Sequence, residues 1–333
     1  MTGNGIGEPK RDGISRLDSE KLIMTSPIES LIFNEHVHIY DCFPGGNPTY
    51  IVVGAEVPEN LRGEANSLIM EKFKTSEFEQ GGFLIESQTG KAAIRLQMSG
   101  GEFCGNATRS AAALLIKDFI GGRMLANQAN YDLIEKEGNL YRFPVEVSGT
   151  EDILYAEVDV SSQEFDVQVE MPVKLAFEAI TEHTLKFNEQ SIKVKLVDMG
   201  GIKHIIVNVE ELPFRDDKQF YGSVLDAFRH QLSLNDSPAV GVIWTNLRED
   251  ETAYIDPLVW VKGTNQYFYE SACGSGTIAV SLCELLDKKD RTLTMDIEQP
   301  SGYVIFTEVK KDSGGFIGGS IKGKVSIRAE LNS

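Results

Sequence analysis

The sequence predicts an α/β protein built from two similar halves, and three observations carry this prediction. The chain has 333 residues, which at roughly 150 residues per domain corresponds to about two domains. Each half contains short strand-like runs followed by a helical run. Each helical run begins with the same Cys-Gly-x-x-Thr motif, at Cys104 and again at Cys273, about half of the chain apart. This repetition indicates an internal duplication.

The expected domains follow from where these patterns begin and end. Residues 1–26 are rich in Gly, Ser and charge and contain no apolar run of signal-peptide length, so we expect a flexible leader. We assign residues 27–170 to the first domain and residues 171–333 to the second.

In the first half, apolar alternation and β-branched runs predict the strands. They are expected at residues 36–40, 50–53, 83–85 and 92–98. The cluster Gly45-Gly46-Asn47-Pro48 predicts a turn, and residues 59–73 have helical spacing. After Cys104, a run rich in Ala and Leu predicts a helix that stops at Gly121-Gly122.

The second half repeats this order. Strands are expected at residues 194–197, 205–207, 240–244 and 258–261, with a turn at Gly200-Gly201. A helix is then predicted from Cys273 to about Leu286, with Ile278, Leu282 and Leu285 on one face.

Composition excludes several classes of protein. The 32 basic and 50 acidic residues give a net charge of −18, and no dense Lys/Arg stripe occurs, which argues against a nucleic-acid partner. No segment reaches the ~18 apolar residues of a membrane span, so no membrane partner is expected. Four cysteines without metal-ligand spacing favour a cytoplasmic protein with reduced thiols and no bound metal.

Two of the four cysteines are candidates for chemistry. A cysteine at a helix start faces the positive end of the helix dipole and free N–H groups, which predicts a pKa below the usual ~8.5. The following glycines, Gly105 and Gly274, let a ligand approach the backbone, and the N–H groups can hold a carboxylate. Two such sites that face each other could remove a proton from one side of a carbon and deliver one to the other. Cys42 and Cys283 are interpreted as core residues.

The two cysteine motifs carry a resemblance to a known family. Phe103-Cys104-Gly105-Asn106 and Ala272-Cys273-Gly274-Ser275-Gly276 resemble the motifs of the diaminopimelate epimerase / proline racemase superfamily, the cofactor-independent two-cysteine racemases. Further similar segments are Gly46-Asn47-Pro48, Gly201-Ile202-Lys203-His204 and Ile317-Gly318-Gly319-Ser320. The resemblance implies two domains, each a curled, mostly antiparallel sheet around a central helix, with the site in the cleft between them.

The resemblance also implies the roles of individual residues. Cys104 and Cys273 would be the catalytic acid and base, and Asn47 would contact the substrate. His204 would lie near the first cysteine, and Glu270 would receive the substrate amine. The remaining substrate-binding residues would hold the α-carboxylate on their backbone N–H groups: Gly105, Asn106, Gly274, Ser275 and Gly276.

Departures from the family pattern bear on the substrate. Val261-Lys262-Gly263 stands where diaminopimelate epimerases carry Glu-Arg-Gly, and Lys262 does not offer the two-pronged guanidinium that grips a second carboxylate. The segment Ser271 to Thr277 is closer to proline racemases, yet Asn106 stands where those have His. This mixed pattern resembles a third branch, the histidine racemases of opine-type metallophore pathways.

We therefore expect an amino-acid racemase that needs no cofactor, neither pyridoxal phosphate nor metal. Its expected partner is a small molecule, an amino acid, and a homodimer is a compatible assembly. Histidine is the first substrate to test, and diaminopimelate is the alternative. Two other classes stay open: a non-catalytic amino-acid-binding protein of the same fold, and a thiol redox sensor.

Overall fold

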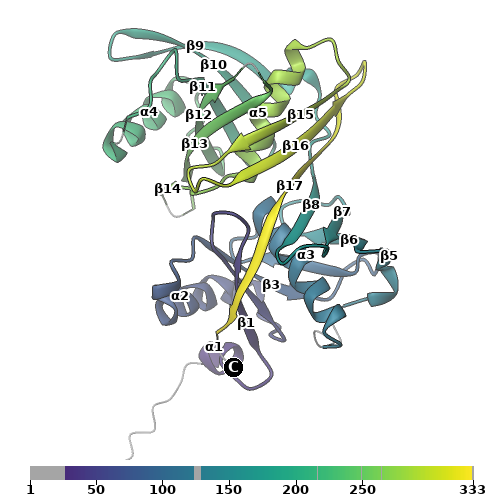
Figure 1. Cartoon of the computed structure of the whole chain (residues 1–333). Coiled ribbons are helices and arrows are strands. Elements are labelled where there is room, and N and C mark those ends of the chain that lie inside the picture. The colour runs from purple at the N-terminus through teal and green to yellow at the C-terminus, as the bar shows by residue number, and fades with distance from the viewer. Residues whose placement is uncertain (1–26, 124–128, 216, 249, 264, 332–333) are drawn as a thin grey trace, which may run out of the picture.

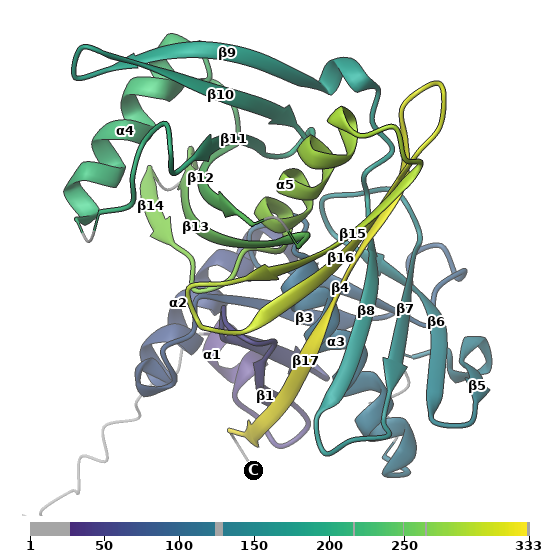
Figure 2. The same ribbon diagram turned by 45° about the horizontal axis from the view of Figure 1, so that its top comes forward.

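Two barrels of strands, each wrapped around one helix, are joined along a single long strand (Figures 1 and 2). The computed structural model describes residues 27–123, 129–215, 217–248, 250–263 and 265–331, so the predicted leader lies outside the described residues. The first half contains α1 (Pro27–Ile32), β1 (His38–Phe43), β2 (Thr49–Val53), α2 (Arg62–Lys72), β3 (Gln80–Ile85), β4 (Ile94–Met98), α3 (Gly105–Ile120), β5 (Glu135–Glu137), β6 (Leu140–Val147), β7 (Leu154–Asp159) and β8 (Phe165–Met171).

The second half contains β9 (Ile180–Phe187), β10 (Gln190–Asp198), β11 (Lys203–Asn208), α4 (Lys218–Gln231), β12 (Ala239–Leu247), β13 (Thr252–Val261), β14 (Gln266–Tyr269), α5 (Gly274–Asp287), β15 (Thr292–Glu298), β16 (Val304–Lys311) and β17 (Phe316–Glu330). The buried strands are rich in Val, Ile and aromatic residues, which pack well on a pleated surface.

The first barrel is a closed ring of strands around α3. Its neighbours run β1–β2–β3–β4–β6–β7–β8, and β17 closes the ring by pairing with both β8 and β1. The pairs β2–β3 and β4–β6 are parallel because a helix connects the strands, and the other pairs are antiparallel. Helix α3 is buried on nearly all sides, as a helix enclosed by a sheet must be, and most of its second half is Ala, Leu and Ile.

The second barrel repeats this connectivity around α5. Its order is β10–β11–β12–β13–β15–β16–β17, with parallel pairs at β11–β12 and β13–β15. Helix α4 stands where α2 stands in the first half, and α5 where α3 stands. The same strand order, the same parallel steps and the same helix positions confirm the predicted α/β fold of two pseudo-symmetric, curled and mostly antiparallel units.

Strand β17 belongs to both barrels. Its first part pairs with β16, its middle with β8 and its last residues with β1. The chain first passes from one barrel to the other after β8. The next strand, β9, pairs with β10 of the second barrel. The predicted boundary between residues 170 and 171 coincides with the end of β8 and stays a prediction.

Most predicted elements lie within a few residues of the observed ones, and both helices after the cysteines are present. Leu31 and Ile32 are the last two residues of helix α1. Helix α3 ends at Gly121, as expected. Strands β5 to β9 and β14 to β17, with helix α4, were not predicted. Among the described residues no helix is long and apolar enough to cross a membrane.

Candidate active site

Both candidate cysteines cap the helix that fills their barrel. Cys104 precedes α3 and Cys273 precedes α5, each with extended backbone geometry. The Cys104 Sγ accepts a hydrogen bond from the Ala107 N–H at 3.4 Å, and the Cys273 Sγ accepts one from the Gly276 N–H at 3.3 Å. Sulfur thus takes the place of the Ser or Asp oxygen that usually caps a helix. The two caps match in detail, as the duplicated motif predicts.

The two helix starts converge on one side chain of the shared strand. A Cβ atom on Gly105 would lie 2.7 Å from the Ile321 Cδ1, and one on Gly274 would lie 3.0 Å from the same atom. The glycine after each cysteine therefore allows the two helices to approach Ile321 closely. The N–H groups in the first turns have no acceptor within their own helices, so they are available to an anion between them.

A direct hydrogen bond joins the two cysteine motifs. The Asn106 Nδ2 donates to the carbonyl oxygen of Ala272 at 3.1 Å, and Ala272 directly precedes Cys273. Asn47, the residue expected to contact substrate, donates its own Nδ2 to the same carbonyl at 3.2 Å. Both amide side chains are almost fully buried. The turn at Asn47 and the helix of the first cysteine thus both bind the residue directly before the second cysteine.

The environment of the thiols corrects the prediction of a lowered pKa. Burial raises the pKa of Cys104 to about 12, and the nearby Glu270 and Glu102 add to the increase, while the N–H of Ala107 lowers it. Burial likewise raises the pKa of Cys273 well above its usual value, and the negative charge of Glu270 contributes. Desolvation and two carboxylates outweigh the helix start, which favours the protonated thiol at both positions.

Glu270 lies close to both cysteines. Its carboxylate accepts a hydrogen bond from the Cys273 thiol, and its charge also raises the pKa of Cys104. Burial raises the pKa of Glu270 to about 7, and the neighbouring Glu79 acts in the same direction. A carboxylate in this position suits a positively charged group of a bound molecule, because such a charge would be held between Glu270 and Glu79.

His204 lies beside the second cysteine motif, which corrects its expected place near the first. Its Nε2 is 2.9 Å from the Ser275 Oγ, and that hydroxyl is 3.6 Å from the Cys273 Sγ. The ring is fully buried, and burial lowers the pKa of His204 to about 3. His204 is therefore a neutral residue that supports Ser275 and does not reach the site as an acid.

Sequence reasoning missed four polar residues that surround the pair. Gln80 accepts a hydrogen bond from the Cys104 thiol at 2.9 Å, and Gln299 accepts one from the Cys273 N–H at 3.0 Å. Glu79 accepts from the Ser271 hydroxyl at 2.5 Å, and burial raises the pKa of both Glu79 and Glu102. The one local signal was a pair of polar residues, Glu79 and Gln80, directly before the Gly81-Gly82 of a buried strand.

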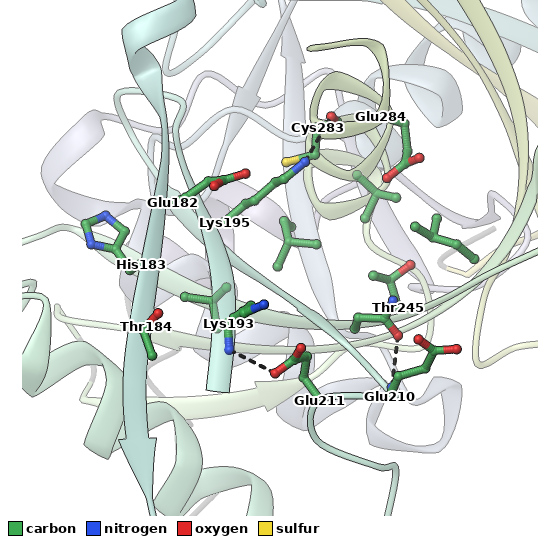
Figure 3. A pocket seen from close by; sticks show the side chains of 15 residues that line it. Glu182, His183, Thr184, Lys193, Lys195, Glu210, Glu211, Thr245, Cys283 and Glu284 are labelled. Atoms are coloured by element: carbon green, nitrogen blue, oxygen red, sulfur yellow. Dashed lines mark hydrogen bonds between the residues drawn. The ribbon is translucent and has the colours of Figure 1, made fainter. Parts of the chain in front are cut away.

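The second half of the chain contains a cavity beside Glu270 and another near Cys283. The first, of about 560 Å³, is lined by Tyr269, Glu270, Ser271, Tyr221 and Asp256 among others, and neither Cys104 nor Cys273 is part of its lining. The other, of about 610 Å³, lies between the strands β9 and β10 and the helix α5 and contains Cys283 but neither Cys104 nor Cys273 (Figure 3). Cys283 and Cys42 are buried, as expected of core residues.

No group of three potential metal ligands (His, Cys, Asp or Glu) occurs among the residues that the structure describes. All four cysteines are free thiols. The chemistry that the described side chains offer is therefore proton transfer between two thiols and a carboxylate, next to backbone N–H groups that can hold an anion.

Comparisons with known proteins show which family the chain resembles. A family model described as the histidine racemase CntK N-terminal domain matches residues 36–332. A histidine racemase of Fusobacterium nucleatum is 28% identical over 270 residues, which cover 78% of this chain and 84% of that protein. A histidine racemase of Staphylococcus aureus is 24% identical over 288 residues, which cover 86% and 93% of the two chains.

Solved structures share the fold at low sequence identity. A probable proline racemase from Agrobacterium radiobacter with bound carbonate superposes with a TM-score of 0.57 at 13% identity, covering 88% of this chain and 91% of the other. A hydroxyproline epimerase from Agrobacterium vitis with bound trans-4-hydroxy-L-proline also has a TM-score of 0.57, at 12% identity, covering 90% and 91%.

Proposed function

Because the chain belongs to the histidine racemase CntK N-terminal domain family, we propose that it inverts the α-carbon of histidine with Cys104 and Cys273 as the two bases. The protein is an amino-acid racemase, an isomerase. The observation that carries the two-base proposal is the pair of matched cysteine caps, whose helices converge on Ile321 and are joined by the bond from Asn106 to Ala272.

In the proposed reaction one cysteine acts as a thiolate and the other as a thiol. The thiolate removes the α-proton from one face, and the electron pair of the broken C–H bond spreads into the carboxylate. The opposite thiol then delivers its own proton to the other face, so the site ends with the charges of the two sulfurs exchanged. N–H groups of Gly105, Asn106, Gly274 and Ser275 would stabilise the negative charge that develops on the carboxylate. The Gly276 N–H, expected from the sequence to do the same, donates to the Cys273 Sγ instead.

The raised thiol pKa values suggest how the thiolate forms. A substrate that brings an α-ammonium group to Glu270 offsets the negative charge that adds to burial in raising the pKa of both thiols. The bound cation therefore lowers the pKa of the thiols, and the thiolate appears only when a substrate is present. A cationic or neutral side chain fits this charge balance better than an acidic one, which favours histidine.

Further parts of the proposal rest on the resemblance and on composition. We propose a cytoplasmic protein, which its four free cysteines support. We also propose that the D-histidine it makes serves the biosynthesis of a metallophore. A homodimer, the absence of a nucleic-acid partner and independence from cofactors stay predictions.

The proposal is tested by incubating the protein with each standard amino acid and with diaminopimelate in D₂O. Mass spectrometry then measures α-deuterium, and chiral chromatography measures inversion. We expect histidine to be inverted with one α-deuterium in the product. Inversion of diaminopimelate alone would assign the chain to the epimerase branch. Binding without exchange for every amino acid would favour a non-catalytic protein, and loss of binding on mild oxidation alone would favour a redox sensor.

A further inference from the structure

Arg109 is a buried charge with no carboxylate at ion-pair distance in the described part of the chain, although the charge of Asp166 acts on it from further away. It lies on α3 just over one helical turn after Cys104, and its side chain is fully buried. No ion pair to Arg109 occurs among the described residues, and two of its guanidinium nitrogens, Nε and Nη1, have no hydrogen-bond partner there. A buried charge with unsatisfied donors lowers stability by several kcal/mol unless other contacts compensate. Its retention at such a position calls for a role.

The third guanidinium nitrogen of Arg109 donates two hydrogen bonds. The Nη2 donates to the Asn106 Oδ1 at 2.7 Å and to the carbonyl oxygen of Pro44 at 2.8 Å. A guanidinium only donates, so it fixes which end of the Asn106 amide faces it. The amide nitrogen must then point the other way, and it does so by donating to the Ala272 carbonyl at 3.1 Å.

The contact of Arg109 with Pro44 also leads to the Ala272 carbonyl, by way of Asn47. Pro44 opens the turn that ends at Asn47, whose left-handed backbone (φ 54°) lets its side chain turn inward. The Asn47 Nδ2 donates to the Ala272 oxygen at 3.2 Å. Both paths from Arg109 therefore end on the residue before Cys273, although Arg109 itself belongs to the helix of Cys104.

Space around the guanidinium is closed by the shared strand. A Cβ atom on Gly323 of β17 would lie 2.6 Å from the Arg109 Nη1, so glycine at this point leaves room for the guanidinium in its observed place. The side chain thus lies between α3, the Pro44 turn and β17, which joins the two barrels.

We propose that Arg109 is the positioning residue that keeps Cys273 opposite Cys104, through Asn106 and the Pro44–Asn47 turn. The proposal rests on the two-base function proposed above. If the link is weakened, the base that meets the substrate can still remove the α-proton, but the opposite thiol is no longer placed to deliver its own. Proton exchange is then separated from inversion.

The test compares the Arg109→Lys and Arg109→Gln variants with the wild type in D₂O. Deuterium in the recovered substrate and deuterium in the inverted product are measured at early times, on whichever amino acid the wild type inverts. We expect kcat for inversion to fall at least tenfold with KM within about threefold of the wild type. The ratio of exchange without inversion to inversion should rise at least fivefold. Arg142→Gln, which removes an exposed arginine of the same half, is the matched control.

Misfolding is distinguished from misplacement by this ratio, because an unfolded fraction removes exchange and inversion equally. Arg109→Ala with added guanidinium chloride at low concentration gives a second readout, in which the small cation refills the vacated space and restores inversion. An unchanged ratio in both variants, or a kcat within twofold of the wild type, would overturn the proposal. A wrong substrate assignment leaves the comparison intact, because the substrate is the one that the wild type inverts.

Discussion

The thiol of Cys273 donates a hydrogen bond to the carboxylate of Glu270, three residues earlier in the chain. This bond lowers the pKa of the Glu270 carboxyl, whereas the charge of Glu270 raises the pKa of the Cys273 thiol, so the thiol keeps its proton. The same carboxylate also acts on Cys104. Glu270 therefore sets the charge state of both candidate bases, and the predictions below follow from that arrangement.

Replacement of either candidate base should abolish inversion. We expect Cys104→Ala and Cys273→Ala each to lower kcat for racemisation by between ~10²- and 10⁴-fold, the usual range for a general acid or base. Because one thiol remains, each variant should still exchange the α-hydrogen of one enantiomer with solvent. Chiral chromatography with deuterium counting measures both effects.

Cys283→Ala is the matched control for this experiment, because it removes a buried thiol from the same helix as Cys273. It should keep most of the racemase activity. Full activity in either variant of the candidate pair would refute the two-base mechanism.

The activity should depend on pH through Glu270. Its pKa is raised to about 7, so kcat/KM should increase as pH rises through this value and the carboxylate becomes charged for the substrate amine. Glu270→Gln should raise KM, lower kcat and remove this limb of the profile. A pH profile that keeps the same limb in Glu270→Gln would assign the ionisation to another group, and Glu79 would be the next to test.

The free energy of unfolding should also depend on the ionisation of Glu270, but ionisation should lower stability where it increases activity. The folded pKa of Glu270 lies above the unfolded value, so the folded state binds more protons and the free energy of unfolding falls as pH rises from about 4.5 to 7. Glu270→Gln should remove this decrease, on the order of 2 kcal/mol. Urea denaturation at pH 5 and pH 8 measures it, and an equal pH dependence in both proteins would contradict it.

The space for the His204 ring is provided by Gly241. A Cβ atom there would lie 2.4 Å from the His204 Nδ1, so Gly241→Ala should displace the ring from Ser275. Overpacking of this kind lowers the free energy of unfolding by about 1–3 kcal/mol, and kcat should fall with it. Urea denaturation and steady-state kinetics provide the two measurements.

Gly222→Ala is the control, since nothing lies within 4 Å of a Cβ atom at Gly222, a half-buried position in the first half of α4. That change should stabilise the protein by roughly 0.5–1 kcal/mol, because alanine loses less backbone entropy in a helix than glycine. If Gly241→Ala were as stable as the wild type, His204 would have an alternative position that keeps Ser275 in place.

Sequence alone predicted the parts of the site that are local. The helices after Cys104 and Cys273 were evident because a Cys-Gly pair precedes an apolar run, and capping depends on residues three positions apart. Glu79 was missed because it meets Ser271 from the other half of the chain, 192 residues away. Such contacts depend on the barrel closure, and the pairing of β17 with β1 and β8 leaves no local pattern.

The direction of the thiol pKa values was wrong for a similar reason. The helix start and its N–H groups are visible in the sequence, and they do lower the pKa of both cysteines. Burial is the larger contribution and arises only when two barrels close around the site. Arg109 was likewise not singled out, because an arginine in a helix is usually exposed and its neighbours Pro44 and Asn106 become adjacent only in the fold.

The last prediction concerns the substrate side chain. Lys262 stands at the position of the family arginine that grips a second carboxylate, and its Nζ instead pairs with Asp236 at the surface, at 2.8 Å. Glu79, Glu102 and Glu270 surround the thiols, so a second carboxylate would be buried without a cation and near three acidic groups. Such burial costs several kcal/mol, which corresponds to orders of magnitude in rate.

We therefore expect kcat/KM for histidine to exceed that for diaminopimelate by at least 10²-fold. Of the three aromatic residues before Glu270, Tyr269 lines the same cavity as Glu270, whereas Tyr267 donates to Asp226 at the exposed face. Tyr269→Ala should thus raise KM for histidine more than Tyr267→Ala, its control. If diaminopimelate were the faster substrate, the cavity beside Tyr269 would have to supply a cation for its second carboxylate, and Arg215, which lines that cavity, would be the residue to replace next.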